Sequence, residues 1–266
     1  MTGAKPEDRA CKQLPSFEII GHGGAGAFYP GNTRDAILTG LRLGVDRIEF
    51  DLMAAGDGQL VLVHDLRHTD EEGLIHRTSI SPVDLLKRIL PGFITFDEAV
   101  ELTKGKAPLL LDVKVPGFEP ALISSIKRHQ LEDDIHISCT NPRTIKRLRA
   151  AFPTMPIGLS TGHRPTGGAL EYGRWVTGKI LRAIGPFPLL ITMRWCGANE
   201  IMLHRHLVSR RVVRAFHRRG HKVFAWTVDK PNEIKRVASC QVDGIISNRP
   251  DLVQELLRPD QVAGRY

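Results

Sequence analysis

Short apolar, β-branched segments alternate along the chain with longer segments whose apolar residues recur at helical spacing. The first kind predicts buried strands and the second predicts amphipathic helices. Eight strands separated by helices are typical of a (β/α)8 barrel, so we expect an α/β fold of the TIM type. The predicted strands cover residues 17–22, 46–52, 109–114, 134–138, 156–160, 189–194, 222–228 and 243–247.

Two segments interrupt this alternation. Residues 53–105 contain a further short strand at 59–65 and two short helices, which predicts a small insertion after the second strand. Residues 161–188 form a second irregular segment after the fifth strand. Both should decorate the C-terminal face of the barrel, where barrel enzymes carry their chemistry. We expect residues 1–15 to form an N-terminal tail and residues 16–266 to form the barrel domain.

Composition narrows the classes of function. With 42% hydrophobic residues in 266, the chain should bury a sizeable core, and a disordered protein is excluded. A formal net charge of +8 favours anionic partners such as phosphoesters or acidic lipids. No recognised nucleic-acid motif accompanies the charge, so we expect no nucleic-acid partner. Four widely separated cysteines and the lack of a signal-like or membrane-spanning apolar run predict a cytoplasmic protein.

Acidic residues gather near the ends of two predicted strands. Glu49 and Asp51 are two residues apart, as are Asp112 and Lys114, so each pair shares one face of its strand. If both pairs point inward, three carboxylates and an ammonium group meet at the mouth of the barrel. Crowded carboxylates repel one another, and a divalent cation removes that cost. Oxygen ligands suit a hard ion, so the pattern predicts an Mg²⁺ or Ca²⁺ site.

Two histidines are candidates for acid/base catalysis at the same mouth. His22 follows the first predicted strand, and His64 follows the extra strand of the insertion. Histidine titrates near neutral pH, and cleavage of a phosphodiester requires one group to accept a proton and another to donate one. Asp65 follows His64 directly and could orient its ring.

Several motifs together are similar to the glycerophosphodiester phosphodiesterase family. GHGGAGAFYPGNT, IEFDL and DGQLVLVHD resemble its opening signature, H-R-G-x-x-x-x-x-P-E-N-T, E-x-D and D-G-x-x-V-x-x-H-D. LLLDVK resembles its third-strand E-x-K, FAWTVD its W-T-V-N, and DGIISNRPDLV its closing D-G-I-x-T-D-x-P. The resemblance runs from about Ser16 to Leu257, which is nearly the whole chain.

The resemblance implies metal-dependent hydrolysis of glycerophosphodiesters to glycerol 3-phosphate and an alcohol. It also implies a role for each matching residue. Glu49, Asp51 and Asp112 would hold the metal, His22 and His64 would form the acid/base pair, Lys114 would contact the phosphate, and Trp226 would pack on the glycerol moiety.

The chain departs from the family signature at three positions of this site. Gly23 stands where the signature has arginine, Gly31 where it has glutamate, and Asp112 where it usually has glutamate. We expect another arginine to replace the missing one, because a guanidinium group matches the geometry of phosphate oxygens. Arg194, at the end of the predicted sixth strand, is the preferred candidate, and Arg164 is the alternative.

Other functions remain open at this stage. The segment 161–188 could form an apolar lid over a lysophospholipase D-like site that acts on lipids. Gly23 and Gly31 are also compatible with a degenerate barrel that binds phosphoesters without cleaving them. The basic segment SRRVVRAFHRRGHK is predicted to be an outer barrel helix with a solvated basic face, and peripheral contact with an anionic membrane is its alternative. The sequence does not indicate an oligomeric state.

Overall fold

The central feature of the fold is a closed sheet of eight parallel strands. The computed structural model describes residues 17–161 and 185–262. The first strand of the barrel pairs with the last on one side and with the second on the other, which closes the barrel and confirms the predicted architecture. The strands are β1 (Glu18–Gly21), β2 (Arg47–Ala54), β6 (Leu109–Val113), β7 (Ile135–Cys139), β8 (Ile157–Ser160), β9 (Glu200–His204), β10 (Lys222–Trp226) and β11 (Gly244–Ser247).

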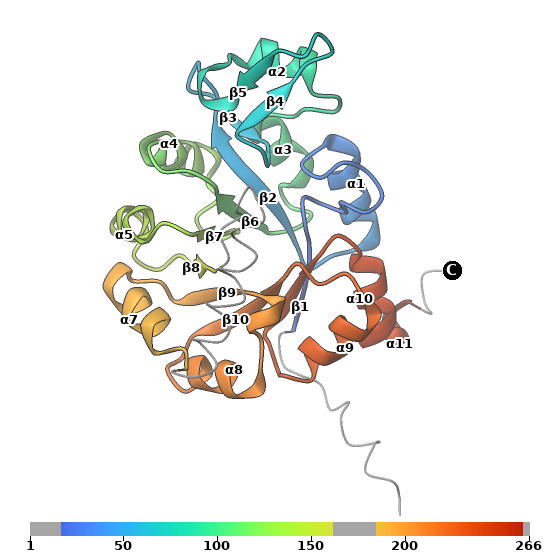
Figure 1. Ribbon diagram of the computed structural model, residues 1–266, viewed down its shortest axis with the longest axis vertical. Helices are drawn as coiled ribbons and strands as arrows, with labels where there is room; N and C mark the ends of the chain where they lie inside the picture. Colours follow the sequence, from blue (N-terminus) through green and yellow to red (C-terminus); the bar gives the residue numbers. More distant parts are fainter. Residues whose placement is uncertain (1–16, 162–184, 263–266) are drawn as a thin grey trace, which may run out of the picture.

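Helices surround this sheet on its outside (Figure 1). Several of them begin at polar caps: the side chains of Thr33, Thr95 and Ser209 accept hydrogen bonds from backbone N–H groups of the first turn. Within the described residues, no helix has the length and apolar character needed to cross a membrane. The helices around the barrel are α1 (Arg34–Leu43), α3 (Phe96–Thr103), α4 (Glu119–His129), α5 (Pro142–Ala151), α7 (Phe187–Cys196), α8 (Arg210–His217), α9 (Pro231–Ala238), α10 (Pro250–Leu257) and the short α11 (Pro259–Val262).

The alternation of side chains along the strands separates two apolar layers. Ile48, Phe50 and Leu52 of β2 point outward into the main core between the sheet and the helices. A second, smaller cluster fills the inside of the barrel. Glu49 and Asp51 take the inward positions of β2, as their parity predicted. The inner cluster consists of Ile20, Leu110, Met202, Phe224 and Ile246, with Trp226 packed against it.

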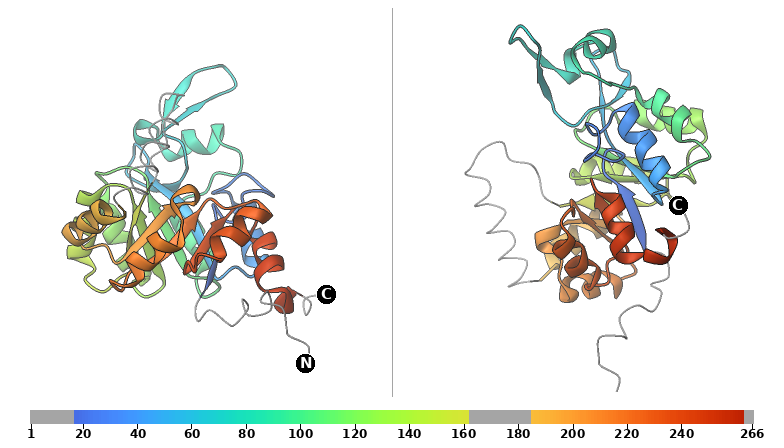
Figure 2. Two further views of the ribbon diagram at one scale, coloured as in Figure 1. Left: turned by 60° about the horizontal axis from the view of Figure 1, so that its bottom comes forward. Right: turned by 90° about the vertical axis from the view of Figure 1, so that its right-hand side faces the viewer.

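The predicted insertion after the second strand is present and holds more structure than its sequence pattern indicated. β3 (Leu60–Leu62) pairs antiparallel with the end of β2, and a hairpin of β4 (Arg67–Thr69) and β5 (Ile75–Arg77) follows. The hairpin projects beyond the barrel (Figure 2). The 3₁₀-helix η2 (Thr78–Ile80) and α2 (Val83–Ile89) then lead back to α3. Met53, Val61, Val63, Val83 and Leu86 form the insertion's own small core.

The predicted sixth strand is wrong. Residues 189–194 lie inside α7, and the sixth barrel strand is β9, which begins only at Glu200. A short apolar run does not by itself distinguish a strand from a buried helix. The flanking residues do: Pro188 occupies the first turn of α7, and Gly197 caps its end in the left-handed conformation with φ 78°.

This error moves the preferred arginine away from the site. Arg194 is exposed on an outer helix and does not end a barrel strand, so it cannot serve the mouth as predicted. Arg164 lies outside the described residues. The basic segment does form an outer helix, α8, with Val212, Val213 and Phe216 buried. The predicted outer helix is therefore confirmed.

Candidate active site

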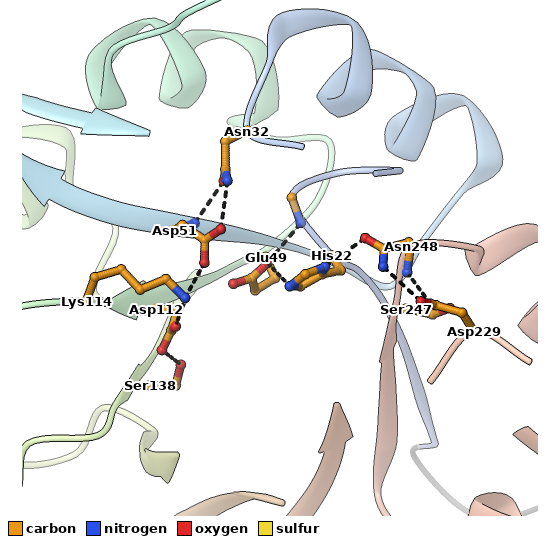
Figure 3. Close-up of polar contacts among 11 residues, drawn as sticks. His22, Asn32, Glu49, Asp51, Asp112, Lys114, Ser138, Asp229, Ser247 and Asn248 are labelled. Carbon is orange, nitrogen blue, oxygen red and sulfur yellow. Dashed lines mark hydrogen bonds and ion pairs between the residues drawn. The ribbon is translucent and has the colours of Figure 1, made fainter. Parts of the chain in front are cut away.

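Three carboxylates meet where the parallel strands β2 and β6 lie side by side. Asp51 and Asp112 are direct partners in the register of these strands, and Glu49 lies one inward position earlier on β2. Each of the three offers an oxygen within 4.8 Å of the others. Glu49 and Asp51 are buried, with 4% and 2% of their surface exposed, and Asp112 is half-buried. The structure thus brings together the predicted metal ligands (Figure 3).

Neutral donors hold each carboxylate in place. The side chain of Asn32 binds Asp51 twice: its Nδ2 donates to Oδ2 over 2.7 Å, and its Oδ1 accepts from the Asp51 backbone N–H over 2.9 Å. The backbone N–H of Gly23 donates to Glu49 Oε2 over 2.8 Å, and Ser138 Oγ donates to Asp112 Oδ1 over 2.7 Å. Sequence reasoning missed Asn32 and Ser138 as site residues, although Asn32 lies within the segment that matches the opening signature.

Lys114 supplies the positive charge of this cluster. Its Nζ lies 2.5 Å from Asp51 Oδ1 and also contacts Asp112 (Figure 3). Burial alone would raise the pKa of Asp51, but the Lys114 ammonium and the imidazole of His22 outweigh burial and lower that pKa to about 2. Burial would likewise lower the pKa of Lys114, and the carboxylates of Asp112 and Asp51 raise it instead.

Glu49 behaves in the opposite way. Burial, followed by the neighbouring charge of Asp51, raises its pKa to about 8. Lys114 and His22 reduce this shift without reversing it. In the metal-free protein, Glu49 is therefore the member of the cluster that keeps its proton at neutral pH, because the single ammonium group is already shared by the other two carboxylates.

The cluster fits a divalent cation. Asp51 Oδ1 is fully buried and has no hydrogen bond of acceptable geometry, even though the Lys114 ammonium lies close to it. Three convergent carboxylates with an incompletely bonded oxygen offer the hard oxygen ligands that Mg²⁺ and Ca²⁺ prefer. The sulfur atoms of Cys139, Cys196 and Cys240 are buried elsewhere and are not part of this donor set.

His22 faces the cluster at a fixed orientation. Its Nδ1 lies 2.8 Å from Asn248 Oδ1, and its Nε2 lies 4.0 Å from Glu49 Oε2. Asn248 is held by Asp229, whose carboxylate accepts from the Asn248 side-chain Nδ2 over 2.9 Å and from its backbone N–H over 2.8 Å. Because Nδ2 donates to a carboxylate, Oδ1 must be the acceptor that faces His22. The neutral ring therefore carries its proton on Nδ1 and directs Nε2 toward the carboxylates.

The His22 environment also favours the protonated ring. Burial alone would lower the pKa of His22, but the charges of Glu49 and Asp51 and the hydrogen bond to Asn248 together raise it. Sequence reasoning did not connect Asn248 and Asp229 with His22. A signal was present, because the family signature has asparagine and aspartate at these two positions, whereas this chain has aspartate and asparagine. The structure shows that the two exchanged residues are in direct contact.

His64 and Trp226 complete the mouth. The Nδ1 of His64 lies 2.7 Å from Asp65 Oδ1, as the sequence suggested. The indole Nε1 of Trp226 donates to the Met202 carbonyl over 3.1 Å, which fixes the ring at the edge of the barrel. Both residues line a cavity of about 680 Å³, and so do His22, Glu49, Asp112 and Lys114. Asp51 lies beneath the surface of this cavity.

The backbone conformation at Gly23 disfavours an arginine at this position. Its backbone has φ +53°, and a Cβ atom there would lie 2.9 Å from the Cα of Gly31 and 3.0 Å from the backbone N of Asn32. The two glycines that replace charged residues of the signature are therefore in contact. An arginine at 23 would strain the turn that presents the Gly23 amide to Glu49.

Glu49→Gln should remove a pH dependence from the stability of the metal-free protein. In the wild type, folded Glu49 keeps a proton that the unfolded chain releases, so the free energy of unfolding should fall as pH rises from 4.5 to about 8. The loss is on the order of a few kcal/mol, since one pKa unit corresponds to about 1.4 kcal/mol. Urea denaturation in EDTA across this pH range measures the effect.

Glu119→Gln is the matched control, because Glu119 is a buried glutamate outside the site. Burial would raise its pKa, but hydrogen bonds from Thr144 and Gly117 lower it below 4.5. Its contribution is therefore complete above that pH and is lost only as the pH falls further. The difference between wild type and Glu119→Gln should be constant from pH 4.5 to 8. A Glu49→Gln profile parallel to the wild type would contradict the assignment.

Asn248→Ala should abolish the tautomer preference of His22. At a pH high enough to neutralise the ring, the wild type should show a proton on Nδ1, because Asn248 accepts from that atom. Long-range ¹H–¹⁵N NMR of the imidazole nitrogens reads this directly. Ser138→Ala, which loses a contact to Asp112 only, should leave the His22 signals unchanged. A wild-type His22 protonated on Nε2 would disprove the orientation of Asn248.

Known glycerophosphodiester phosphodiesterases resemble this protein over nearly the whole chain. A glycerophosphodiester phosphodiesterase of Caldanaerobacter subterraneus is 26% identical over 258 residues, which covers 90% of this chain and 97% of that protein. The solved structure of a Thermotoga maritima glycerophosphodiester phosphodiesterase superimposes with a TM-score of 0.69 at 19% identity, covering 90% of this chain and 98% of the other.

A second solved structure shares the fold. It is an Oleispira antarctica phosphodiesterase in complex with the product sn-glycerol-3-phosphate, with a TM-score of 0.73 at 19% identity, covering 90% of this chain and 95% of that one. A sequence model of the Glycerophosphoryl diester phosphodiesterase family matches residues 22–252, from the first candidate histidine to the last outer helices of the barrel. The chain therefore belongs to the glycerophosphoryl diester phosphodiesterase family.

Proposed function

We propose that this protein is a metal-dependent hydrolase that cleaves glycerophosphodiesters to glycerol 3-phosphate and an alcohol. One observation carries the proposal: acid/base, cation-binding and sugar-alcohol-binding groups surround a single cavity. His22, His64 and Lys114 line it together with two of the three carboxylates and Trp226. The volume of about 680 Å³ lies in the range of small-molecule sites. The named product of the Oleispira antarctica relative supports glycerol 3-phosphate as the product here.

Glu49, Asp51 and Asp112 would hold an Mg²⁺ or Ca²⁺ ion. Such an ion neutralises negative charge that develops on the phosphate during cleavage. The residues themselves prepare the site: Asn32 and Ser138 fix the directions of two carboxylates, and the Gly23 amide fixes the third. Preorganised ligands of this kind cost no rearrangement when charge develops.

His22 and His64 would share the acid/base work. Both rings have Nδ1 engaged, with Asn248 and Asp65 respectively, and this leaves Nε2 as the reactive atom of each. One histidine would take the proton of the attacking hydroxyl group, and the other would protonate the leaving alcohol. Attack by water gives glycerol 3-phosphate directly, whereas attack by the glycerol 2-hydroxyl gives a cyclic phosphate that a water molecule then opens. Acid/base help of this kind contributes roughly 10²–10⁴-fold to a rate.

Lys114 would contact the phosphate, and Trp226 would pack on the glycerol moiety. The ammonium group of Lys114 lies at the cavity surface between two carboxylates, from which it can reach an anion in the cavity. The indole N–H of Trp226 is already satisfied by Met202, so the face of the ring remains for apolar contact.

Cleavage is favoured over binding alone. Gly23 and Gly31 remove charged groups of the family signature, but both histidines and two of the three clustered carboxylates line one cavity, with the third carboxylate beside them. The lipid-specific alternative depends on the segment 161–188, most of which lies outside the described residues, and it stays a prediction.

Asp51→Asn and Asp112→Asn should each abolish turnover, and EDTA should do the same to the wild type. Both carboxylates are placed as metal ligands, and a neutral amide holds a divalent cation far less well. The assay is release of glycerol 3-phosphate from a panel of glycerophosphodiesters, with EDTA and with added Mg²⁺ or Ca²⁺. Ser138→Ala should keep most activity, because it removes one supporting bond. An active Asp51→Asn protein would refute the metal assignment.

His22→Ala and His64→Ala should each lower kcat/KM by at least roughly 10²-fold. The double variant should lose far less than the product of the two single effects, because the pair acts as a unit. The wild type should show a bell-shaped pH profile of kcat/KM, with both limbs altered when either ring is removed. Strictly multiplicative losses, or a single variant with wild-type rates, would argue against paired catalysis.

A further inference from the structure

A guanidinium group from the insertion after β2 lines the cavity. Arg67 is the first residue of β4, three positions after His64, and it lines the cavity with Lys114 and Trp226. Its side chain is exposed, and it makes no ion pair with any residue that the structure describes. Among the described residues that line this cavity, only Arg67 and Lys114 carry a permanent positive charge.

Three other cations near the mouth, among the described residues, are already paired with carboxylates. Lys114 is held between Asp51 and Asp112. Arg205 is paired with Glu233, and Arg249 is paired with Asp251. Arg67 is therefore available to an anion in the cavity.

The hairpin holds Arg67 beside a second arginine. Arg67 is the direct cross-strand partner of Arg77, so both side chains project from the same face of the two-stranded sheet. Like charges directly opposite one another destabilise a hairpin by up to about 1 kcal/mol. An anion bound by Arg67 would relieve that repulsion.

The backbone of Arg67 is nevertheless well anchored. Thr78 ties the base of the hairpin to the segment that carries His64: its backbone N–H donates to the Leu66 carbonyl over 3.1 Å, and its Oγ1 donates to the Asp65 carbonyl over 3.0 Å. His76 and Asp70 pair at 2.6 Å near the turn. The backbone of Arg67 is thus held in place close to His64, while its long side chain is exposed and can reach a ligand in the cavity.

Charge balance indicates what that ligand is. The three carboxylates of the cluster would be offset by Lys114 and one divalent cation, so a phosphodiester brings one further negative charge into the cavity. A planar guanidinium group can donate two parallel hydrogen bonds to phosphate oxygens. We propose that Arg67 binds the substrate phosphate and replaces, from the insertion, the arginine that Gly23 cannot provide. This inference rests on the proposed function.

The experiment is phosphate binding by Arg67→Met, measured by calorimetry with sn-glycerol 3-phosphate and with inorganic phosphate on the metal-loaded protein. The dissociation constants should rise at least roughly tenfold, equivalent to about 1.4 kcal/mol. Arg67→Lys should recover part of the lost affinity, because lysine restores the positive charge but not the two parallel N–H donors of a guanidinium group. Arg194→Met, an exposed arginine on α7, should bind as the wild type does, and Arg77→Met should be affected less than Arg67→Met.

Two further readouts separate this inference from the proposed function. If the wild type hydrolyses glycerophosphodiesters but Arg67→Met keeps its KM and its phosphate affinity, the role of Arg67 is overturned and the function stands. If wild-type turnover is absent and Arg67→Met still binds phosphate more weakly, the anion site stands and the hydrolase proposal fails. Thermal unfolding of each variant guards against misfolding, which is not expected for an exposed side chain in a hairpin.

Discussion

The burial of three carboxylates beside one another is the constraint on which the mouth of the barrel depends. Glu49 and Asp51 share the inward face of β2, and Asp112 joins them from the next strand, so repulsion is built into the register of the sheet. Nearby groups offset it: Lys114 by its charge, and Asn32 and the Gly23 amide by hydrogen bonds. The first loop of the barrel is shaped by this task, which explains the positive φ of Gly23 and of Asn32.

The same constraint explains why the site is prepared for a cation yet stable without one. Protonation of Glu49 removes one negative charge, and the Lys114 ammonium screens the other two. A divalent ion would displace the proton of Glu49 and would weaken the ion pairs of Lys114 with Asp51 and Asp112. Binding of a divalent ion would then exchange one positive charge for another within the same set of carboxylates.

Much of this site could be predicted from the sequence, because the period of a strand fixes which residues share a face. In a barrel covered by helices, the inward parity of Glu49, Asp51 and Asp112 has few alternatives. Ser138 could have been found in the same way, since it is the register partner of Asp112 on β7. Asn248 was harder to connect with His22, because that contact joins residues 226 positions apart through the closure of the barrel, and only the exchange of residues at 229 and 248 pointed to it.

The position of the sixth strand could not be predicted from the hydrophobic pattern, for a different reason. An apolar run beside an irregular segment carries no period of its own, and only Pro188 and Gly197 mark it as a helix. The prediction that Arg194 ends a barrel strand failed for the same reason. The position of Arg67 at the cavity does not follow from the sequence, because the hairpin that carries it is made of three-residue strands with no apolar alternation.

The contact between Asp229 and Asn248 has a consequence for how such sites diverge. The pair works because one member is a carboxylate that only accepts hydrogen bonds and the other is an amide that also donates. The family signature has the same two groups in the opposite order. A single exchange at either position would set two carboxylates or two amides against each other, and would leave His22 with a repelled or ambiguous partner. A change from one arrangement to the other therefore requires two coordinated substitutions, because either one alone disturbs the partner of His22.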